Sequence, residues 1–238
     1  MVHRFHNRAE AGRRLAANLI TYANRPDILV LALPRGGVPV AFEVAQALHA
    51  PLDVVLVRKL GVPGREELAM GAIASGGVRV LNADVVEGLG IPNDVIGRVA
   101  AAEQRELERR ERVYRGDRPA PEVRDRIVIL VDDGLATGTT MHAAVAAVSQ
   151  QRPARIVVAV PTIALASCAA FRSVVDAVVW VIAPEPFGAV GLCYDDFTPA
   201  TDEAICALLA PPAPAPSPTP GGTSPSGSSD RRRGALGC

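Results

Sequence analysis

A run of five uninterrupted aliphatic residues, Ile127–Val131, constrains the fold of this chain more than any other feature. The run has no polar face, so it suits a strand that is buried on both sides, as in a parallel sheet. Two adjacent acids, Asp132 and Asp133, follow directly, and a Gly/Thr-rich loop then leads into the apolar stretch 141–148. The order strand, loop, helix predicts one unit of an α/β fold, with the helix N-terminus directed at the loop.

Strand and helix patterns alternate along the rest of the chain. Predicted strands cover 28–33, 53–57, 127–131, 155–160 and 177–182, and predicted helices cover 10–22, 38–49, 93–114, 141–148, 164–171 and 203–209. Residues 58–67, rich in charge and turn formers, are expected to form a mobile loop, and 70–81 a hairpin around Gly76 and Gly77. This alternation predicts a doubly wound, mainly parallel sheet with right-handed crossovers.

Composition divides the chain into one domain and a tail. Residues 1–210 are long enough for a single core, whereas 211–238 consist almost entirely of Pro, Ala, Ser, Gly, Thr and Arg and are expected to be disordered. The formal charge is zero, so the composition gives no argument for a nucleic-acid or membrane partner. No signal-peptide pattern is visible, and the four cysteines show no C-x-x-C spacing, which favours reduced thiols and a cytoplasmic location.

Three predicted strands end in unusual polar loops. The loop after the first strand contains Gly36 and Gly37, the second strand leads into Arg58 and Lys59, and the third loop is 132–140. Glycines let a backbone approach an anion, adjacent cations suit phosphoryl groups, and carboxylates accept hydrogen bonds from hydroxyls. Because ligands bind at the carboxyl ends of parallel strands, the loops predict one site for a phosphorylated, hydroxylated ligand. Ordinary Gly-rich turns and solvated surface cations are the alternative interpretation.

The stretch 132–140, Asp-Asp-Gly-Leu-Ala-Thr-Gly-Thr-Thr, resembles the 5-phosphoribosyl 1-diphosphate (PRPP) signature of the type I phosphoribosyltransferases. It departs from that signature at Gly134, where the family usually carries a larger aliphatic residue. The resemblance implies that Asp132 and Asp133 hold the ribose hydroxyls, directly or beside Mg²⁺. It also implies that the 5-phosphate is held by Ala136, Thr137, Gly138, Thr139 and Thr140. No Walker A or dinucleotide-binding glycine pattern is present.

The other two loops resemble the same family. Pro34, Arg35, Gly36 and Gly37 are similar to its diphosphate-binding loop, which commonly holds a strained or cis peptide bond, here expected between Pro34 and Arg35. The pair Arg58 and Lys59 resembles cations that bind the leaving diphosphate in several members and that precede a flexible lid, here 61–67.

The segment 184–197 resembles the small C-terminal hood of hypoxanthine-type members. Glu185 falls where those enzymes place an acid near a second metal, and a surface role is an equal alternative. The chain departs from these enzymes because no Lys lies beside Thr162 and Val178 replaces a base-stacking aromatic residue. A purine acceptor is therefore in doubt, and Trp180 is interpreted as either a stacking residue or a core residue.

The resemblance implies transfer of a 5-phosphoribosyl group from PRPP to a nitrogen acceptor, a base or an amine, with Mg²⁺ and a homodimeric assembly. A PRPP-binding regulator or sensor without turnover is the alternative from another class. The charged stretch 103–112 has opposite charges at helical spacing and is interpreted as a solvent-exposed helix without a catalytic role.

Overall fold

The computed structural model describes residues 4–210, and the predicted tail at 211–238 lies outside the described residues. A five-stranded sheet with the order β2-β1-β6-β7-β8 forms its centre, and every neighbouring pair of strands is parallel. The strands are β1 (Ile28–Ala32), β2 (Leu52–Val54), β6 (Ile127–Val131), β7 (Arg155–Thr162) and β8 (Ala177–Ile182). The predicted doubly wound α/β class is confirmed.

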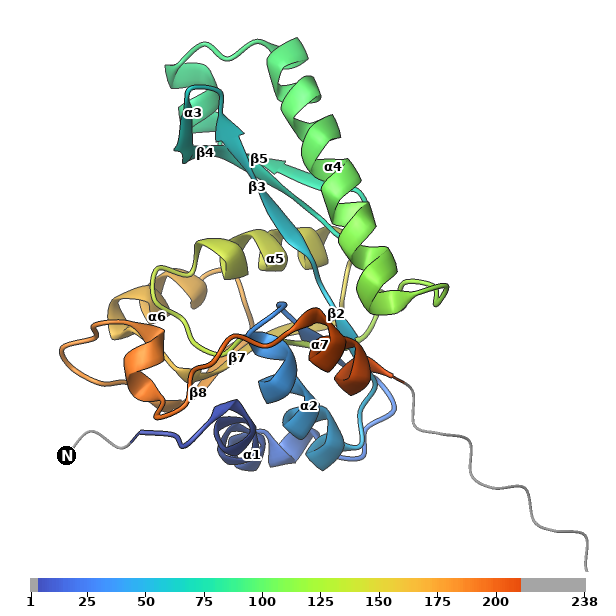
Figure 1. Ribbon diagram of the computed structural model, residues 1–238, viewed down its shortest axis with the longest axis vertical. Coiled ribbons are helices and arrows are strands. Elements are labelled where there is room, and N and C mark those ends of the chain that lie inside the picture. The colour runs from blue at the N-terminus through green and yellow to red at the C-terminus, as the bar shows by residue number, and fades with distance from the viewer. Residues whose placement is uncertain (1–3, 211–238) are drawn as a thin grey trace, which may run out of the picture.

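Helices cover both faces of this sheet (Figure 1). One face carries α1 (Arg8–Asn18) and α2 (Gly37–Leu48), and the other carries α5 (Thr139–Gln150) and α6 (Leu165–Phe171). A 3-10 turn, η1 (Ile20–Tyr22), follows α1, and α7 (Asp202–Leu209) packs against α2.

The aliphatic run of β6 explains why both faces are needed. Ile129 and Val131 point into the core beneath α1 and α2, whereas Val128 and Leu130 point into the core beneath α5 and α6. All four side chains are fully buried. Burying one such side chain contributes roughly 1.5–3 kcal/mol, so a polar residue at any of these positions would strongly disfavour the strand.

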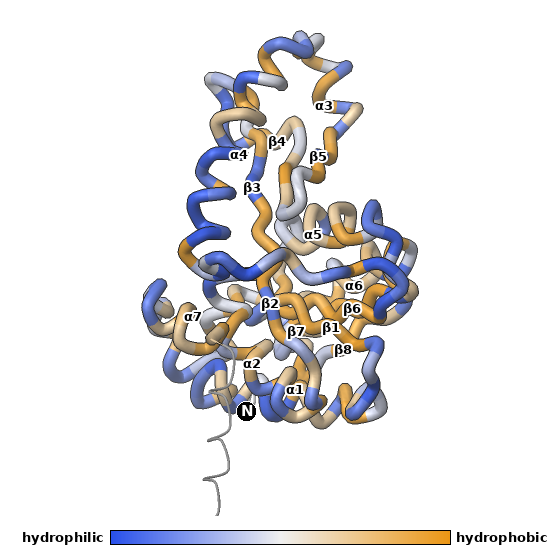
Figure 2. The backbone as a smooth tube through the Cα atoms, turned by 90° about the vertical axis from the view of Figure 1, so that its right-hand side faces the viewer, coloured by the Kyte–Doolittle hydropathy of each residue, from blue (hydrophilic) through white to orange (hydrophobic). Residues whose placement is uncertain are grey.

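A second, antiparallel sheet projects from the domain and forms an arm (Figures 1 and 2). It contains β3 (Val57–Val62), β4 (Arg65–Ala74) and β5 (Val78–Leu81), followed by α3 (Ala83–Gly88) and α4 (Asn93–Arg115). Helix α4 returns along β3 to the central sheet. The hairpin predicted at 70–81 is confirmed: β4 and β5 pair, and Gly76 and Gly77 between them both have positive φ.

The prediction that 58–67 form a mobile loop without regular structure in the core is wrong, because these residues form the β3–β4 hairpin. Leu60 and Met70 are fully buried in the same core as residues of α4, and this burial stabilises a strand whose charges suggested a loop. The predicted strand 53–57 is also divided, since β2 ends at Val54 and β3 starts at Val57.

A buried ion pair joins α4 to the central sheet. Arg115 Nε lies 3.2 Å from Asp53 Oδ1 in β2, and Arg115 Nη2 donates a hydrogen bond to Val54 O at 3.1 Å. Both charged side chains are buried, so each needs the other to offset its loss of hydration. The end of α4 is therefore held against the carboxyl edge of the central sheet.

The sheet reverses its strand order between β1 and β6. The chain passes from β1 to β2 on one side, whereas β6 lies on the other side with Ala32 opposite Val131. Helices α2 and α5, which follow these two central strands, lie on opposite faces. Such a reversal opens a crevice at the carboxyl ends of the strands, where ligands bind in doubly wound sheets. No helix within residues 4–210 is long and apolar enough to cross a membrane.

Candidate functional site

The loops after β1 and β6 touch each other through glycines. A Cβ atom on Gly36 would lie 2.7 Å from Asp133 Cγ, and one on Gly37 would lie 2.6 Å from Val131 O. Any larger residue at either position would push the two loops apart. The peptide bond between Pro34 and Arg35 is cis, as the resemblance implied, and Arg35 itself is exposed. The first and third predicted loops thus form one continuous surface.

Asp132 and Asp133 lie half-buried at this contact. The Asp133 amide donates a hydrogen bond to Asp132 Oδ1 at 2.8 Å. Burial, followed by the adjacent charge of Asp133, raises the pKa of Asp132 well above its usual value. Burial also raises the pKa of Asp133, although Arg8 acts in the opposite direction. Two desolvated carboxyl groups side by side are well suited to accept hydrogen bonds from neutral hydroxyl groups.

Arg8, at the start of α1, is a site residue that the sequence did not reveal. Its Nε donates to Asp133 Oδ2 at 2.8 Å, and its Nη1 donates to Thr198 O at 2.9 Å. Its Cζ lies 3.9 Å from the centre of the Phe197 ring, a cation–π contact. Tyr194 Oη donates to Asp133 O at 2.5 Å, so α1 and the hood both fix the second acid. No local pattern marks Arg8, because its partner is 125 residues away in the chain.

The rest of the third loop forms the N-terminus of α5. Gly138 adopts φ +74° and the helix begins at Thr139 without a side-chain cap. The hydroxyl groups of Thr137 and Thr139 lie 3.4 Å apart, and both residues are exposed, as is Thr140. Uncapped N–H groups and the helix dipole favour an anion at this position. The preceding Ala136 is fixed through its carbonyl oxygen, which accepts a hydrogen bond from the Ser167 hydroxyl.

The departure from the family signature at Gly134 has a structural cause. A Cβ at this position would lie 2.8 Å from Thr162 Cγ2 and closer still to the side chain of Val190. Val190 starts the 3-10 turn η2 (Val190–Cys193) in the hood. The hood therefore packs against the signature loop, and the missing side chain makes room for it.

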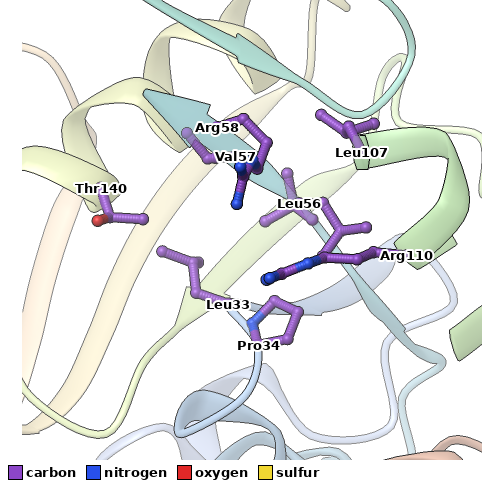
Figure 3. A pocket seen from close by; sticks show the side chains of 9 residues that line it. Leu33, Pro34, Leu56, Val57, Arg58, Leu107, Arg110 and Thr140 are labelled. Carbon is purple, nitrogen blue, oxygen red and sulfur yellow. The ribbon is translucent and has the colours of Figure 1, made fainter. Parts of the chain in front are cut away.

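The second loop meets the other two at a small cavity of about 40 Å³ (Figure 3). Its lining includes Pro34 from the first loop, Arg58 from β3 and Thr140 from α5. Arg58 and Thr140 also line an open groove of about 670 Å³ between β3 and α4. All three predicted loops are thus brought together, with the cavity and the groove sharing a wall.

The two predicted cations of the second loop are held by acids. Arg58 Nη2 lies 2.6 Å from Glu103 Oε2 of α4, and Lys59 Nζ lies 3.6 Å from Glu67 Oε2 of β4. The Arg58 pair is about one-third exposed and the Lys59 pair is more exposed, so both pairs are weak and exchangeable. Sequence reasoning gave 103–112 no role at the site, yet Arg110 of the same helix lines the small cavity.

No residue of the predicted hood at 184–197 is among those that line this cavity. Glu185 is exposed after β8, and no hydrogen bond or ion pair joins it to another residue within 4–210. Trp180 lies on β8 and packs beside the core beneath α5 and α6, as the core interpretation expected, and Val178 packs there too.

The family resemblance implies Mg²⁺, an ion that prefers carboxylate and other oxygen ligands. Within the part of the chain that the structure describes, no three His, Cys, Asp or Glu side chains are grouped to hold a metal, and Glu185 joins no such group. Magnesium is usually bound by one or two carboxylates together with water and substrate phosphates, not by a cage of protein ligands. Asp132 and Asp133 fit a metal that arrives with a phosphorylated substrate.

Comparison with known proteins agrees with this geometry. The phosphoribosyl transferase domain family matches residues 1–195. A crystal structure of TT1426 from Thermus thermophilus is 42% identical, with a TM-score of 0.77, and the match covers 87% of this chain and 97% of that chain. A protein named "Putative phosphoribosyl transferase" from Mycobacterium tuberculosis, found in strains CDC 1551 and H37Rv, is 44% identical over 205 residues.

The mycobacterial match covers 86% of this chain and 46% of the relative, so the chain spans about half the length of these curated relatives. The family match, in contrast, includes β1, β6 and both loops that follow them. The chain therefore belongs to the phosphoribosyl transferase domain family.

Proposed function

We propose that this protein transfers the 5-phosphoribosyl group of PRPP to a nitrogen acceptor and releases diphosphate. The meeting of three polar loops at one crevice is the observation that carries the proposal. One loop supplies two carboxyl groups and a helix N-terminus, and the other two supply glycine backbone and cations. A sugar with hydroxyl groups in the middle and phosphoryl groups at both ends matches this distribution of charge.

The ribose and its 5-phosphate are assigned to the third loop. The carboxyl groups of Asp132 and Asp133 accept hydrogen bonds from the 2′- and 3′-hydroxyl groups, and Arg8 keeps Asp133 oriented. The 5-phosphate lies at the start of α5, where the backbone of Ala136 and Gly138 and the exposed threonines donate to it. Holding the hydroxyl groups and the 5-phosphate fixes the position of the anomeric carbon, where the bond to the diphosphate breaks and the bond to the acceptor nitrogen forms.

The diphosphate is assigned to the first and second loops. The backbone at Gly36 and Gly37 permits close approach, while Arg35, Arg58 and Lys59 offset the negative charge that grows as the bond to the anomeric carbon breaks. Asp132 and Asp133 would hold a magnesium ion that arrives with the substrate, and that ion would supply further positive charge for the leaving diphosphate. The residues themselves act by position and charge.

The acceptor is proposed only as a nitrogen nucleophile, a base or an amine. Val178 occupies the position where the resemblance places a base-stacking aromatic residue, and Trp180 packs beside the core. Strand β8 therefore gives no support for a stacked purine acceptor. The finer proposals of a homodimer, of Mg²⁺ and of a cytoplasmic location rest on the resemblance of the loops to the family.

Incubation of the purified protein with labelled PRPP, Mg²⁺ and a panel of bases and amines tests the proposal. Release of diphosphate that depends on one acceptor supports the transferase. Tight binding of PRPP without turnover on any acceptor would favour a regulatory PRPP-binding protein instead. Failure to bind PRPP at millimolar concentration would remove the proposal altogether.

A further inference from the structure

Helix α4 forms a wall of the small cavity that the three loops share. Its residues Leu107 and Arg110 line the cavity together with Pro34, Arg58 and Thr140. Figure 3 shows the guanidinium groups of Arg110 and Arg58 directed into the same space above Pro34, from α4 and β3 respectively. Two cations from separate elements therefore face one cavity at the end of the diphosphate-binding loop.

Each of these cations is paired with a glutamate of α4. Glu103 binds Arg58 at 2.6 Å, and Glu106 accepts a hydrogen bond from Arg110 Nε at 2.9 Å. Residues 103, 106 and 110 are separated by three and four positions, so they lie on one face of the helix. All four side chains are between 28% and 43% exposed, and pairs in contact with water exchange partners at little cost.

The charges of Arg110 and Arg35 both act on the phenol of Tyr114. Burial and the hydrogen bond to Asp202 raise the pKa of the Tyr114 phenol to about 12, and the charges of Arg110 and Arg35 oppose this rise. Both guanidinium groups are therefore close enough to influence one buried phenol. Arg35 belongs to the loop after β1, whereas Arg110 lies four residues before Tyr114 on α4.

We propose that Arg110 binds the diphosphate of the phosphoribosyl donor, so that α4 supplies part of the wall of the site. The inference rests on the proposed function and adds a residue to it. A diphosphate carries several negative charges on oxygens that match the two-pronged donor geometry of a guanidinium group. On binding, the phosphoryl oxygens replace Glu106 as the partner of Arg110 and Glu103 as the partner of Arg58.

The neighbouring Arg109 supplies a matched control. It also pairs with Glu106, at 2.8 Å, and it carries the same charge, but its side chain is 63% exposed and it is not among the residues that line the cavity. The variants Arg110→Gln and Arg109→Gln thus lose the same charge and the same glutamate partner. The difference that the comparison uses is that Arg110 lines the cavity and Arg109 does not.

Titration calorimetry with inorganic diphosphate and with PRPP, each with Mg²⁺, tests the proposal. We expect Arg110→Gln to weaken both ligands about tenfold to hundredfold, as the loss of a charge-assisted hydrogen bond does, and Arg109→Gln to stay within about twofold of the wild type. Arg110→Lys should lie between them, because a lysine keeps the charge without the two-pronged geometry.

Equal affinities for Arg110→Gln and Arg109→Gln, with both proteins folded by circular dichroism, would overturn the role of Arg110 and leave the proposed function in place. A wild-type protein that binds neither diphosphate nor PRPP would instead overturn the proposed function, and this inference with it. The two failures are therefore distinguished by the wild-type titration alone.

Discussion

Arg8 Nε lies 2.8 Å from Asp133 Oδ2 and joins the first residue of α1 to the second acid of the signature loop. The two side chains are 11% and 14% exposed, so little water screens their attraction. Thr198 and Phe197 of the C-terminal segment also contact the guanidinium group. This contact makes the geometry of Asp133 depend on both ends of the described chain.

We expect Arg8→Gln to lower kcat/KM for PRPP by about tenfold or more, since one oriented, charged contact at a site typically contributes a few kcal/mol. Arg8 lowers the pKa of Asp133, so its loss should also move the acidic limb of the pH profile to higher pH. Steady-state kinetics across a pH series from acid to mildly alkaline conditions measures both effects.

Two further variants separate this role from a general loss of charge on α1. Arg8→Lys should recover part of the activity and of the pH profile, because it keeps the positive charge. Arg13→Gln should behave as the wild type, since Arg13 is exposed and pairs with Glu43 of α2. An unshifted pH profile in Arg8→Gln would contradict a positioning role.

Asp132→Asn should stabilise the protein while it removes PRPP use. The asparagine can still accept the hydrogen bond from the Asp133 amide, but it carries no charge to desolvate beside Asp133. We expect a gain of about 1 kcal/mol, which corresponds to roughly 2–4 °C in Tm for a domain of this size. Differential scanning calorimetry measures the gain, and a lower Tm in the variant would refute it.

The gain should depend on pH with a defined sign. The pKa of Asp132 is raised in the folded state, so the folded protein holds this proton more tightly than the unfolded chain. The free energy that ionised Asp132 costs the folded protein is absent below pH 3.8, the ordinary pKa of an aspartate. It grows as the pH rises from there to the folded pKa, and it is complete above the folded pKa. The Tm difference between Asp132→Asn and the wild type should therefore increase, and never decrease, from low to high pH.

Gly36→Ala should impair the site through the backbone alone. The added methyl group would overlap the carboxylate of Asp133, which forces the first and third loops apart. We expect PRPP affinity to fall by about tenfold or more, because displacement of positioned groups by even about 1 Å costs about a hundredfold in rate. Gly97→Ala is the control: its Cβ meets no atom, and alanine in a helix adds about 0.5–1 kcal/mol of stability.

Gly134→Val should destabilise the contact between the signature loop and the hood. Its side chain would overlap Val190 and Thr162, and overpacking of this kind costs about 1–3 kcal/mol. The double variant Gly134→Val with Val190→Ala should recover much of the loss in Tm, because the smaller hood residue makes room. Additive effects of the two substitutions in a double-mutant cycle would show that the residues do not share this space.

Much of the central sheet follows from local pattern. The aliphatic residues of β6 permit only burial on both faces, and this requirement selects a parallel sheet with helices on both sides. The Asp132–Asp133 pair and the following glycine and threonines mark the loop after it, since acids and small residues directly after a buried strand have few structural uses. The arm was predicted less well: the charges of 58–67 indicated a loop, but burial of Leu60 and Met70 in the core shared with α4 makes a hairpin.

The sequence by itself determined the strands and helices of the central sheet and the three polar loops at its strand ends, because hydrophobic periodicity and turn chemistry act over short stretches of chain. Only the tertiary structure decided which distant side chains complete the site. Arg8 reaches Asp133 across 125 residues, and Arg110 faces Pro34 because α4 folds back along β3. Such contacts depend on how elements pack in three dimensions, and a charged residue on a helix carries the same local signal whether it faces solvent or a ligand.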